Sequence, residues 1–103
     1  MVRVLVAAEN ARFNVDDAAR FGDVTYVLPR TRRSISPFKT QELVAQMLEE
    51  LRDVGYDPDV DYVAFTGGMI HVSLLYGAVM KEWGRAKILI FDAPNDRYVE
   101  RTV

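Results

Sequence analysis

The sequence contains no cysteine and only one histidine, His71. Without thiols, the chain cannot form disulfides, thiolate metal sites or a cysteine nucleophile. A single histidine also excludes a zinc site with several histidine ligands. Asp57, Asp59 and Asp61 have a spacing that resembles a calcium loop, but the glycine and the terminal glutamate of such a loop are missing. The sequence therefore predicts no metal site.

The sequence also lacks a long apolar run and a large net charge. Lys81 and Glu82 interrupt its longest apolar stretch, which falls short of the roughly 18 residues of a membrane span. Thirteen basic and 15 acidic residues give a net charge of −2, which provides no overall attraction to nucleic acid or to membranes. The first ten residues, MVRVLVAAEN, follow a strand pattern and not that of a targeting peptide. We therefore expect a cytoplasmic protein that does not associate with membranes.

Strand and helix patterns alternate along the chain. Strands are predicted at residues 2–8, 24–28, 61–66, 87–93 and 97–103, and helices at residues 14–22, 38–55 and 69–83. Asn14 is predicted to cap the first helix, with Gly22 as its end, while Gly55 and Gly84 are predicted to end the other two helices. With 103 residues, the chain is expected to form a single domain.

This alternation predicts an α/β fold with a mostly parallel sheet. The expected architecture is a small Rossmann-like three-layer α/β/α sandwich. The expected strand order is 2-1-3-4-5, with strand 5 antiparallel at the edge, and another order of the same elements is the alternative. In such a sheet, ligands bind beyond the carboxyl ends of the strands, where the winding reverses, here between strands 1 and 3.

Several polar residues follow the strands that end at this edge. Because of this placement, we expect a ligand-binding site formed by Glu9, Asn10, Arg30, Arg32, Arg33, Ser34, Thr66, Gly67, Gly68, His71 and Asp92. The first N–H groups of the helix after Gly68 lack intrahelical partners, and arginine side chains suit phosphate. The site would hold a nucleotide or another phosphorylated small molecule. The alternative is that the two glycines only permit a sharp turn from strand to helix.

His71 lies in the first turn of the third predicted helix, where it could contact phosphate or act as an acid or base. A partly buried histidine bonded to the backbone is the simpler interpretation. Ser73 is turned away from His71 on a helix, so a Ser-His pair is not supported. A phosphoesterase or nuclease that uses His71 with Asp92 or Glu9 is a weaker hypothesis, because the sequence offers no complete catalytic set.

Residues 30–39 contain four basic side chains and no acid. This pattern could form a phosphate clamp or a nucleic-acid contact, but it is also typical of a solvated loop. No aromatic residue lies among the arginines, and Phe38 is predicted to pack on the core at the start of the second helix. Base stacking, and with it nucleic-acid binding, is therefore not favoured.

The third predicted helix, residues 69–83, is apolar around most of its circumference. A sheet covers only one side of such a helix, so another surface must cover the rest. A second copy of the chain in a two-fold interface is the economical answer, and a host protein is the alternative. The residues expected in this interface are Leu74, Leu75, Ala78, Met80 and Trp83.

The last 40 residues contain several short motifs. They are Asp61-Tyr62, Thr66-Gly67, Gly84-Arg85, Asp92 and Tyr98, spread over strands and an apolar helix. In these motifs the chain resembles small bacteriophage-encoded proteins of about 100 residues. The resemblance implies a viral accessory protein that acts in the host cytoplasm, but it implies no activity and no cofactor.

Three hypotheses on function follow from the sequence. The first is a homodimeric, Rossmann-like protein that binds a nucleotide or another anion. The second is a protein-protein interaction module that uses the helix at residues 69–83 and has no small-molecule ligand. The third is the small enzyme described above.

Overall fold

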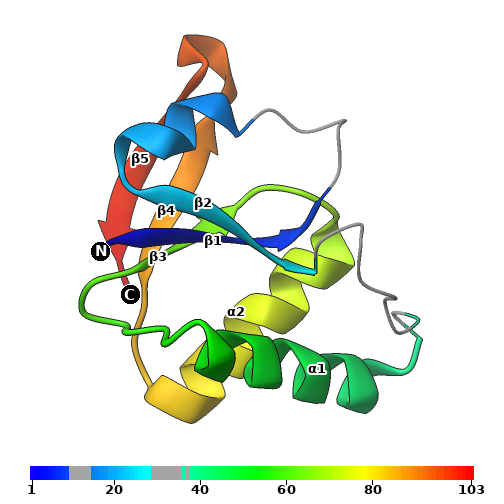
Figure 1. The fold of residues 1–103 in the computed structure, drawn as a ribbon. Helices are drawn as coiled ribbons and strands as arrows, with labels where there is room; N and C mark the ends of the chain where they lie inside the picture. The colour runs from blue at the N-terminus through cyan, green and yellow to red at the C-terminus, as the bar shows by residue number, and fades with distance from the viewer. Residues whose placement is uncertain (10–14, 29–35, 37) are drawn as a thin grey trace.

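The computed structural model describes residues 1–9, 15–28, 36 and 38–103 (Figure 1). Its strands are β1 (Arg3–Ala8), β2 (Asp23–Leu28), β3 (Tyr62–Phe65), β4 (Lys87–Asp92) and β5 (Arg97–Thr102). Its helices are α1 (Thr40–Asp53), α2 (Met69–Trp83) and the short 3-10 helices η1 (Asp16–Arg20) and η2 (Ala93–Asn95).

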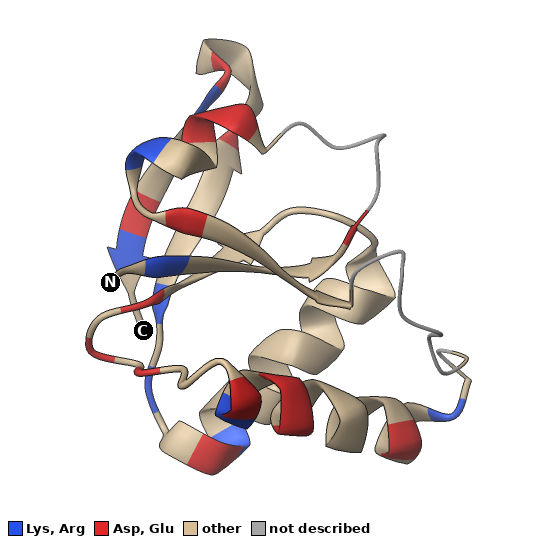
Figure 2. Ribbon diagram, viewed as in Figure 1, with Lys and Arg blue, Asp and Glu red and all other residues tan. Residues whose placement is uncertain are grey.

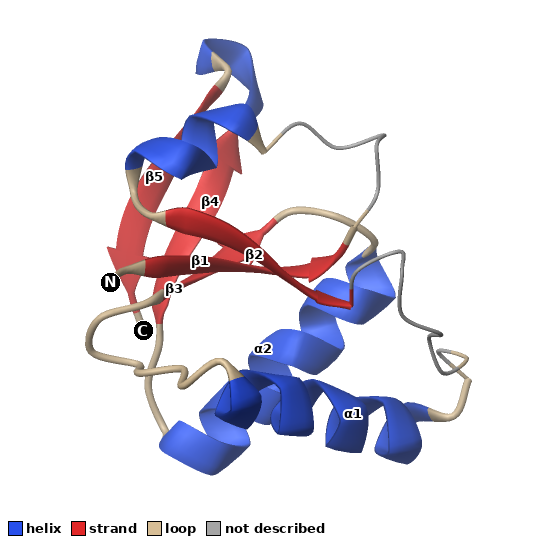
Figure 3. Cartoon of the chain, viewed as in Figure 1, coloured by secondary structure: helices blue, strands red, loops and turns tan. Residues whose placement is uncertain are grey.

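The five strands form one sheet in the order β2-β1-β3-β4-β5. The first four strands are parallel, and β5 pairs antiparallel with β4. The predicted strand order and the Rossmann-like α/β class are thus confirmed. The helices α1 and α2 lie together on one side of the sheet, and η1 lies on the other side (Figure 3).

The two long helices end where the sequence predicts. Gly55 follows α1 with a φ of 73°, and Gly84 caps α2 with a φ of 77°. These left-handed conformations favour glycine because it has no Cβ. After α1, the N–H of Tyr56 donates to the carbonyl of Leu51 and that of Gly55 to the carbonyl of Arg52, which is a Schellman motif.

The first predicted helix is shorter than expected. It is the 3-10 helix η1, and Val15 stands at its N-cap position without a side-chain capping bond. Asn14, the predicted cap, lies outside the described residues. The carboxylate of Asp17, in the first turn of η1, accepts the N–H of Tyr98 on β5 instead of capping its own helix. This tertiary contact could not be read from the local pattern.

The sheet separates two apolar cores. On the α1 and α2 side, aliphatic residues of the helices pack on alternate residues of the strands, such as Leu5, Val63 and Ile88. On the η1 side, Val4, Val6, Ala64, Leu89 and Tyr98 pack against Ala18. We call these the helical side and the η1 side of the sheet. The β4–β5 hairpin curves over the η1 side, so that β5 contacts η1 (Figure 1).

The buried carboxylate of Asp61 anchors the loop before β3. Its two oxygens accept the N–H groups of Arg3 and Asp57, both at 2.9 Å. In the same loop, Asp59 forms a two-contact ion pair with Arg85, with both N–O distances at 2.7 Å. The aspartates of this loop therefore hold the N-terminal end of β1 and the start of β4 in place.

Candidate functional site

The carboxyl ends of β1, β3 and β4 meet at one edge of the sheet, as the sequence predicts for the ligand site. Glu9 follows β1, Thr66 to Gly68 follow β3, and Asp92 ends β4. The remaining predicted residues of this site, Asn10, Arg30, Arg32, Arg33 and Ser34, lie outside the described residues.

The turn from β3 into α2 requires glycine at one of its two glycine positions. Gly67 has a φ of 108°, which L side chains rarely adopt, whereas Gly68 has an extended backbone (φ −63°, ψ 135°) that any residue can take. Gly68 is the N-cap of α2, which has no side-chain cap and no acid in its first turn. A Cβ on Gly68 would meet the Nδ1 atom of His71 at 3.5 Å, an ordinary contact. The start of α2 thus has uncapped N–H groups and no negative charge.

The side chains nearest this turn have structural partners. Tyr98 is buried, and this burial raises the pKa of its phenol, while a hydrogen bond with the side chain of Thr66 partly offsets the rise. Asp92 accepts a hydrogen bond from the amide of Asn95 at 2.7 Å, within the turn to β5. Thr66 therefore links β3 to β5, and Asp92 stabilises a turn.

His71 is half-buried in the first turn of α2. Asp92, one of its two predicted partners, accepts its hydrogen bond from Asn95. The part of the chain that the structure describes contains no group of three or more His, Asp or Glu residues that could hold a metal ion.

An apolar groove opens beside the same turn, between β3 and α2. It has a volume of about 360 Å³ and is lined by Phe65, Thr66, Gly67, Met69, Val72, Ser73 and Tyr76. The rings of Phe65 and Tyr76 meet edge to face, with their centroids 5.2 Å apart. Among the described residues that line this groove, the polar side chains are those of Thr66, Ser73 and Tyr76, so this lining is better suited to an apolar side chain than to a phosphate.

The solvent-facing side of α2 carries no charged residue before Lys81 (Figure 2). Met69 is 83% exposed and Ile70 is 51% exposed. One and two turns further along the helix, Ser73 and Gly77 are exposed as well, and a Cβ added to Gly77 would meet nothing within 4 Å. We call Met69, Ile70, Ser73 and Gly77 the outer face of α2.

The predicted interface residues lie mainly on the other sides of α2. Leu75 and Ala78 are buried in the chain's own core, and Leu74, Met80 and Trp83 are half-buried against it. Trp83 packs edge to face on Tyr56, with ring centroids 4.8 Å apart. The apolar pattern alone did not separate the buried side of α2 from its outer face.

The prediction that Phe38 packs on the core is wrong, because its side chain is 91% exposed. The helix α1 begins two residues later, at Thr40, and its buried stripe begins with Leu43. Phe38 therefore precedes the helix and is not part of its apolar stripe.

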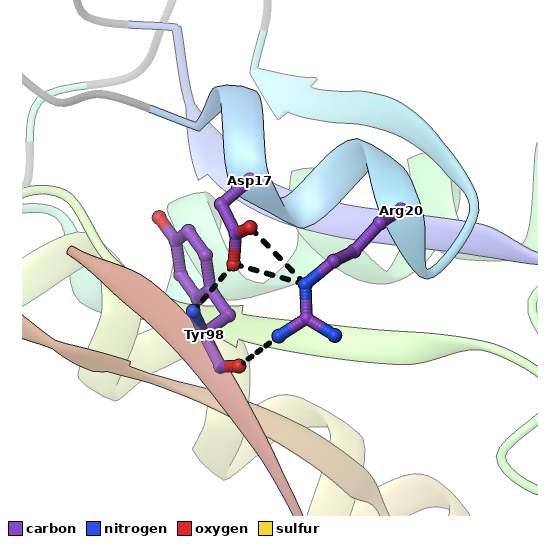
Figure 4. A network of polar contacts seen from close by, with 3 residues as sticks. All are labelled: Asp17, Arg20 and Tyr98. Atoms are coloured by element: carbon purple, nitrogen blue, oxygen red, sulfur yellow. Dashed lines mark hydrogen bonds and ion pairs between the residues drawn. The ribbon is translucent and has the colours of Figure 1, made fainter. Parts of the chain in front are cut away.

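A network of polar contacts on the η1 side joins η1 to the edge strand β5 (Figure 4). The carboxylate of Asp17 accepts the backbone N–H of Tyr98 at 2.7 Å, and a guanidinium nitrogen of Arg20 donates to the Tyr98 carbonyl at 2.6 Å. Arg20 also donates through Nε to Asp17 at 3.1 and 3.2 Å. The Tyr98 N–H and the Arg20 guanidinium together hold the pKa of Asp17 below its usual value.

Sequence reasoning missed this network. Asp17 and Arg20 are separated from Tyr98 by about 80 residues, and their i, i+3 spacing is also what a solvated helix face shows. We call Asp17 and Arg20 the η1 clamp.

Comparison with known proteins identifies the family. The chain matches the Phage Pam3 gp32-like protein family over residues 3–103 and belongs to that family. The match extends over nearly the whole chain, whereas the sequence motifs indicated a resemblance in the last 40 residues alone. No curated protein and no solved structure matches the chain. In the described part of the chain, no helix is long and apolar enough to cross a membrane.

Proposed function

We propose that this phage protein is an interaction protein that forms a homodimer through the outer face of α2. The observation that carries the proposal is the combination of exposed apolar side chains with the adjoining apolar groove. Soluble proteins rarely leave a contiguous apolar surface of this kind open to water unless it has a partner. The function would be exerted in the host cytoplasm, as expected for a phage accessory protein.

The outer face of α2 is suited to a copy of itself. If two α2 helices packed antiparallel around a two-fold axis near Leu75, Ser73 of one copy would lie opposite Gly77 of the other. These small residues would let the helix axes approach closely, and the absence of charge before Lys81 would avoid repulsion between the copies. Ile70 would then lie level with Met80 of the second copy, and Met69 level with the aliphatic part of Lys81.

Ile90 extends this surface onto the sheet. It lies on the helical side, two residues after the buried Ile88, yet it is 43% exposed. The helices pack mainly over β1 and β2, so β4 is less well covered on this side. A second copy on α2 could also shield this part of β4.

The test is a charge introduced at the centre of the outer face. Gly77→Glu adds a carboxylate where the chain has open space, and it replaces glycine with a better helix former, so folding should not suffer. We expect it to raise the midpoint concentration of self-association by at least about tenfold, measured by light scattering coupled to gel filtration. The matched control is Ala45→Glu on the exposed face of α1, which should leave self-association unchanged.

The result that would contradict the proposal is equal self-association of Gly77→Glu and the unchanged protein. A partner protein in place of a second copy would instead leave the unchanged protein monomeric at all concentrations.

A second candidate function is the binding of a nucleotide or another phosphorylated molecule at the start of α2. It is supported by the uncapped N–H groups after Gly68 and by the absence of acid in the first turn. The arginines at residues 30–33 would supply further donors in this hypothesis. The apolar lining of the neighbouring groove and the engagement of Thr66 by Tyr98 make it the weaker of the two proposals.

Gly68→Asp tests this second candidate. The extended backbone of Gly68 accepts any residue, and the new carboxylate would cap the helix while repelling an anion. If the site exists, inorganic phosphate or a nucleotide raises the melting temperature of the unchanged protein but not that of Gly68→Asp. A flat response of the unchanged protein to a panel of nucleotides would remove the hypothesis.

A further inference from the structure

The two edges of the sheet differ in how their outward backbone groups are satisfied. On β5, the outward N–H and carbonyl of Tyr98 are bonded by the η1 clamp, and the carbonyl of Glu100 accepts a hydrogen bond from its neighbour Arg101 at 2.6 Å. Arg97, Glu100 and Arg101 add charge along this edge. Bonded backbone groups and charged side chains both prevent a further strand from adding to β5.

The other edge, β2, differs from β5: its one charged residue is Asp23, at the start of the strand. Asp23 donates its N–H to the carbonyl of Val2, and in a parallel ladder every second residue then faces β1. The backbone groups of Val24 and Tyr26 therefore point away from the sheet. Among the described residues, no other segment forms a backbone hydrogen bond with them. Residues 24–28, VTYVL, also carry no charge.

From this edge we infer a second self-association surface: β2 pairs antiparallel with β2 of another copy, centred on Thr25. The two five-stranded sheets would become one continuous sheet. Val24 and Tyr26 of one copy would form the hydrogen bonds with Tyr26 and Val24 of the other. Thr25 would face Thr25 of the second copy in a pair without hydrogen bonds, because its own N–H and carbonyl face β1.

The side chains of β2 favour this occupant and this register. Val24 of each copy would lie opposite Tyr26 of the other copy, and the two Thr25 residues would lie opposite each other. Aromatic with β-branched pairs and threonine pairs are among those that stabilise antiparallel strands. Asp23 would lie opposite Val27, so no like charges would face each other. The strand is therefore complementary to its own two-fold copy.

This surface is separate from the outer face of α2, since β2 is an edge strand, the helix that packs on it is mainly α1, and the outer face of α2 points to solvent. Two self-complementary surfaces on one chain would produce an assembly larger than a dimer. The inference does not depend on the proposed α2 interface, because β2 pairing alone would also give a dimer.

The absence of cysteine makes a direct test available. In an antiparallel pair without hydrogen bonds, the two Cα atoms lie about 4.5 Å apart, within the range of a disulfide. Thr25→Cys should therefore form a covalent dimer under mild oxidation at low protein concentration. The control is Ala45→Cys on the exposed face of α1, which should cross-link far more slowly.

A second pair of variants tests the same contact without a covalent cross-link. Thr25→Lys would place two positive charges opposite each other and should raise the midpoint concentration of association by about tenfold or more, whereas Thr25→Val should preserve it. Circular dichroism would verify that both variants remain folded.

Combining Thr25→Lys with Gly77→Glu separates the two surfaces. If both exist, each single variant is a dimer and the double variant is a monomer by light scattering. Loss of association in Gly77→Glu alone, with no effect of Thr25→Lys and equal cross-linking of both cysteine variants, would overturn the β2 inference and leave the α2 proposal standing. The reverse pattern would overturn the α2 proposal alone.

Discussion

The two sides of the sheet are built in different ways. The helical side is covered by 14 and 15 residues of α1 and α2, and its core consists mainly of aliphatic side chains. The η1 side is covered by a 3-10 helix of five residues, and it is held by aromatic rings and by the η1 clamp. A short helix can therefore cover one side of a sheet if its side chains form hydrogen bonds with the backbone of the edge strand.

Aromatic residues compensate for the small area of η1. Phe21 contacts Tyr62 edge to face at 5.5 Å, and Phe91 contacts Tyr98 at 5.0 Å between ring centroids. Arg20 lies over the ring of Phe21 at 4.1 Å and Lys87 over that of Tyr62 at 4.3 Å. The large rings supply burial that a longer helix would otherwise provide.

The largest expected effect tests whether the η1 side of the sheet contributes as much to the free energy of unfolding as the helical side. Tyr98→Ala should lower the free energy of unfolding by roughly 3–5 kcal/mol, because it empties a fully buried site on the η1 side. Leu75→Ala on the helical side should cost roughly 2–5 kcal/mol. Urea unfolding measures both. A loss below about 1 kcal/mol for Tyr98→Ala would show that the η1 side is dispensable.

Removing the η1 clamp should have the next largest effect. Asp17→Ala leaves the N–H of Tyr98 and the guanidinium of Arg20 without their carboxylate, and we expect the melting temperature to fall by roughly 10 °C. Glu49→Ala, an exposed carboxylate on α1, is the matched control and should change it by less than about 3 °C. Equal melting temperatures of the two variants would refute a stabilising role for the clamp.

The clamp also predicts a pH dependence. The pKa of Asp17 is lower in the folded protein than its usual value, so its charged form stabilises the fold. This contribution is fully present above the unfolded pKa of about 3.9 and is lost as the pH falls through the lower folded-state pKa. The melting temperatures of the unchanged protein and Asp17→Ala should therefore differ at pH 7, and the difference should shrink as the pH falls below the usual pKa of an aspartate. A constant difference over this range would contradict the assignment.

The smallest effects come from two buried tyrosine hydroxyls, one on each side of the sheet. Tyr98→Phe removes the hydrogen bond with Thr66 and should cost about 1 kcal/mol. The hydroxyl of Tyr56, on the helical side, has no hydrogen-bond partner within the described ranges, so Tyr56→Phe should be neutral or slightly stabilising. Thermal unfolding of the pair measures the contrast, and a larger loss in Tyr56→Phe would reverse it.

Tyr56 also provides a spectroscopic check. Burial, followed by the nearby Asp61, raises its pKa to about 12. The raised pKa means that the folded protein favours the neutral phenol over the phenolate. This preference contributes fully to stability below the unfolded pKa of about 10 and is lost as the pH rises through the folded pKa. When the absorbance of tyrosinate is followed, Tyr56→Phe should show one tyrosine fewer titrating near pH 12 than the unchanged protein.

Regular features of the sequence predicted most of the fold. The alternation of strands and helices predicted the sheet order, and Gly55 and Gly84 predicted the ends of α1 and α2 because glycine readily adopts a left-handed conformation. These signals are local, and the handedness of crossovers joins them into one topology.

The candidate site was less accessible to sequence reasoning. The sequence predicted which residues end at the carboxyl edge, but not that Thr66 is engaged by Tyr98 or that an apolar groove opens beside it. It predicted an unusual outer helix, but it selected Leu75 and Ala78 for the interface, and both are buried in the chain's own core. The period of an apolar pattern is blurred when nearly every side of a helix is apolar.

The amino-acid sequence alone predicts the class of the fold, the order of its strands and the absence of thiol chemistry. These follow from backbone propensity, glycine conformation and residue type, which act locally. Three other features are seen only in the folded chain: the side of α2 that faces water, the exposure of Phe38, and the closing of the β5 edge by Asp17 and Arg20. Those outcomes depend on how the β4–β5 hairpin curves over η1 and how α2 lies on the sheet. Contacts between residues so far apart in the sequence do not produce a periodic pattern of residue types.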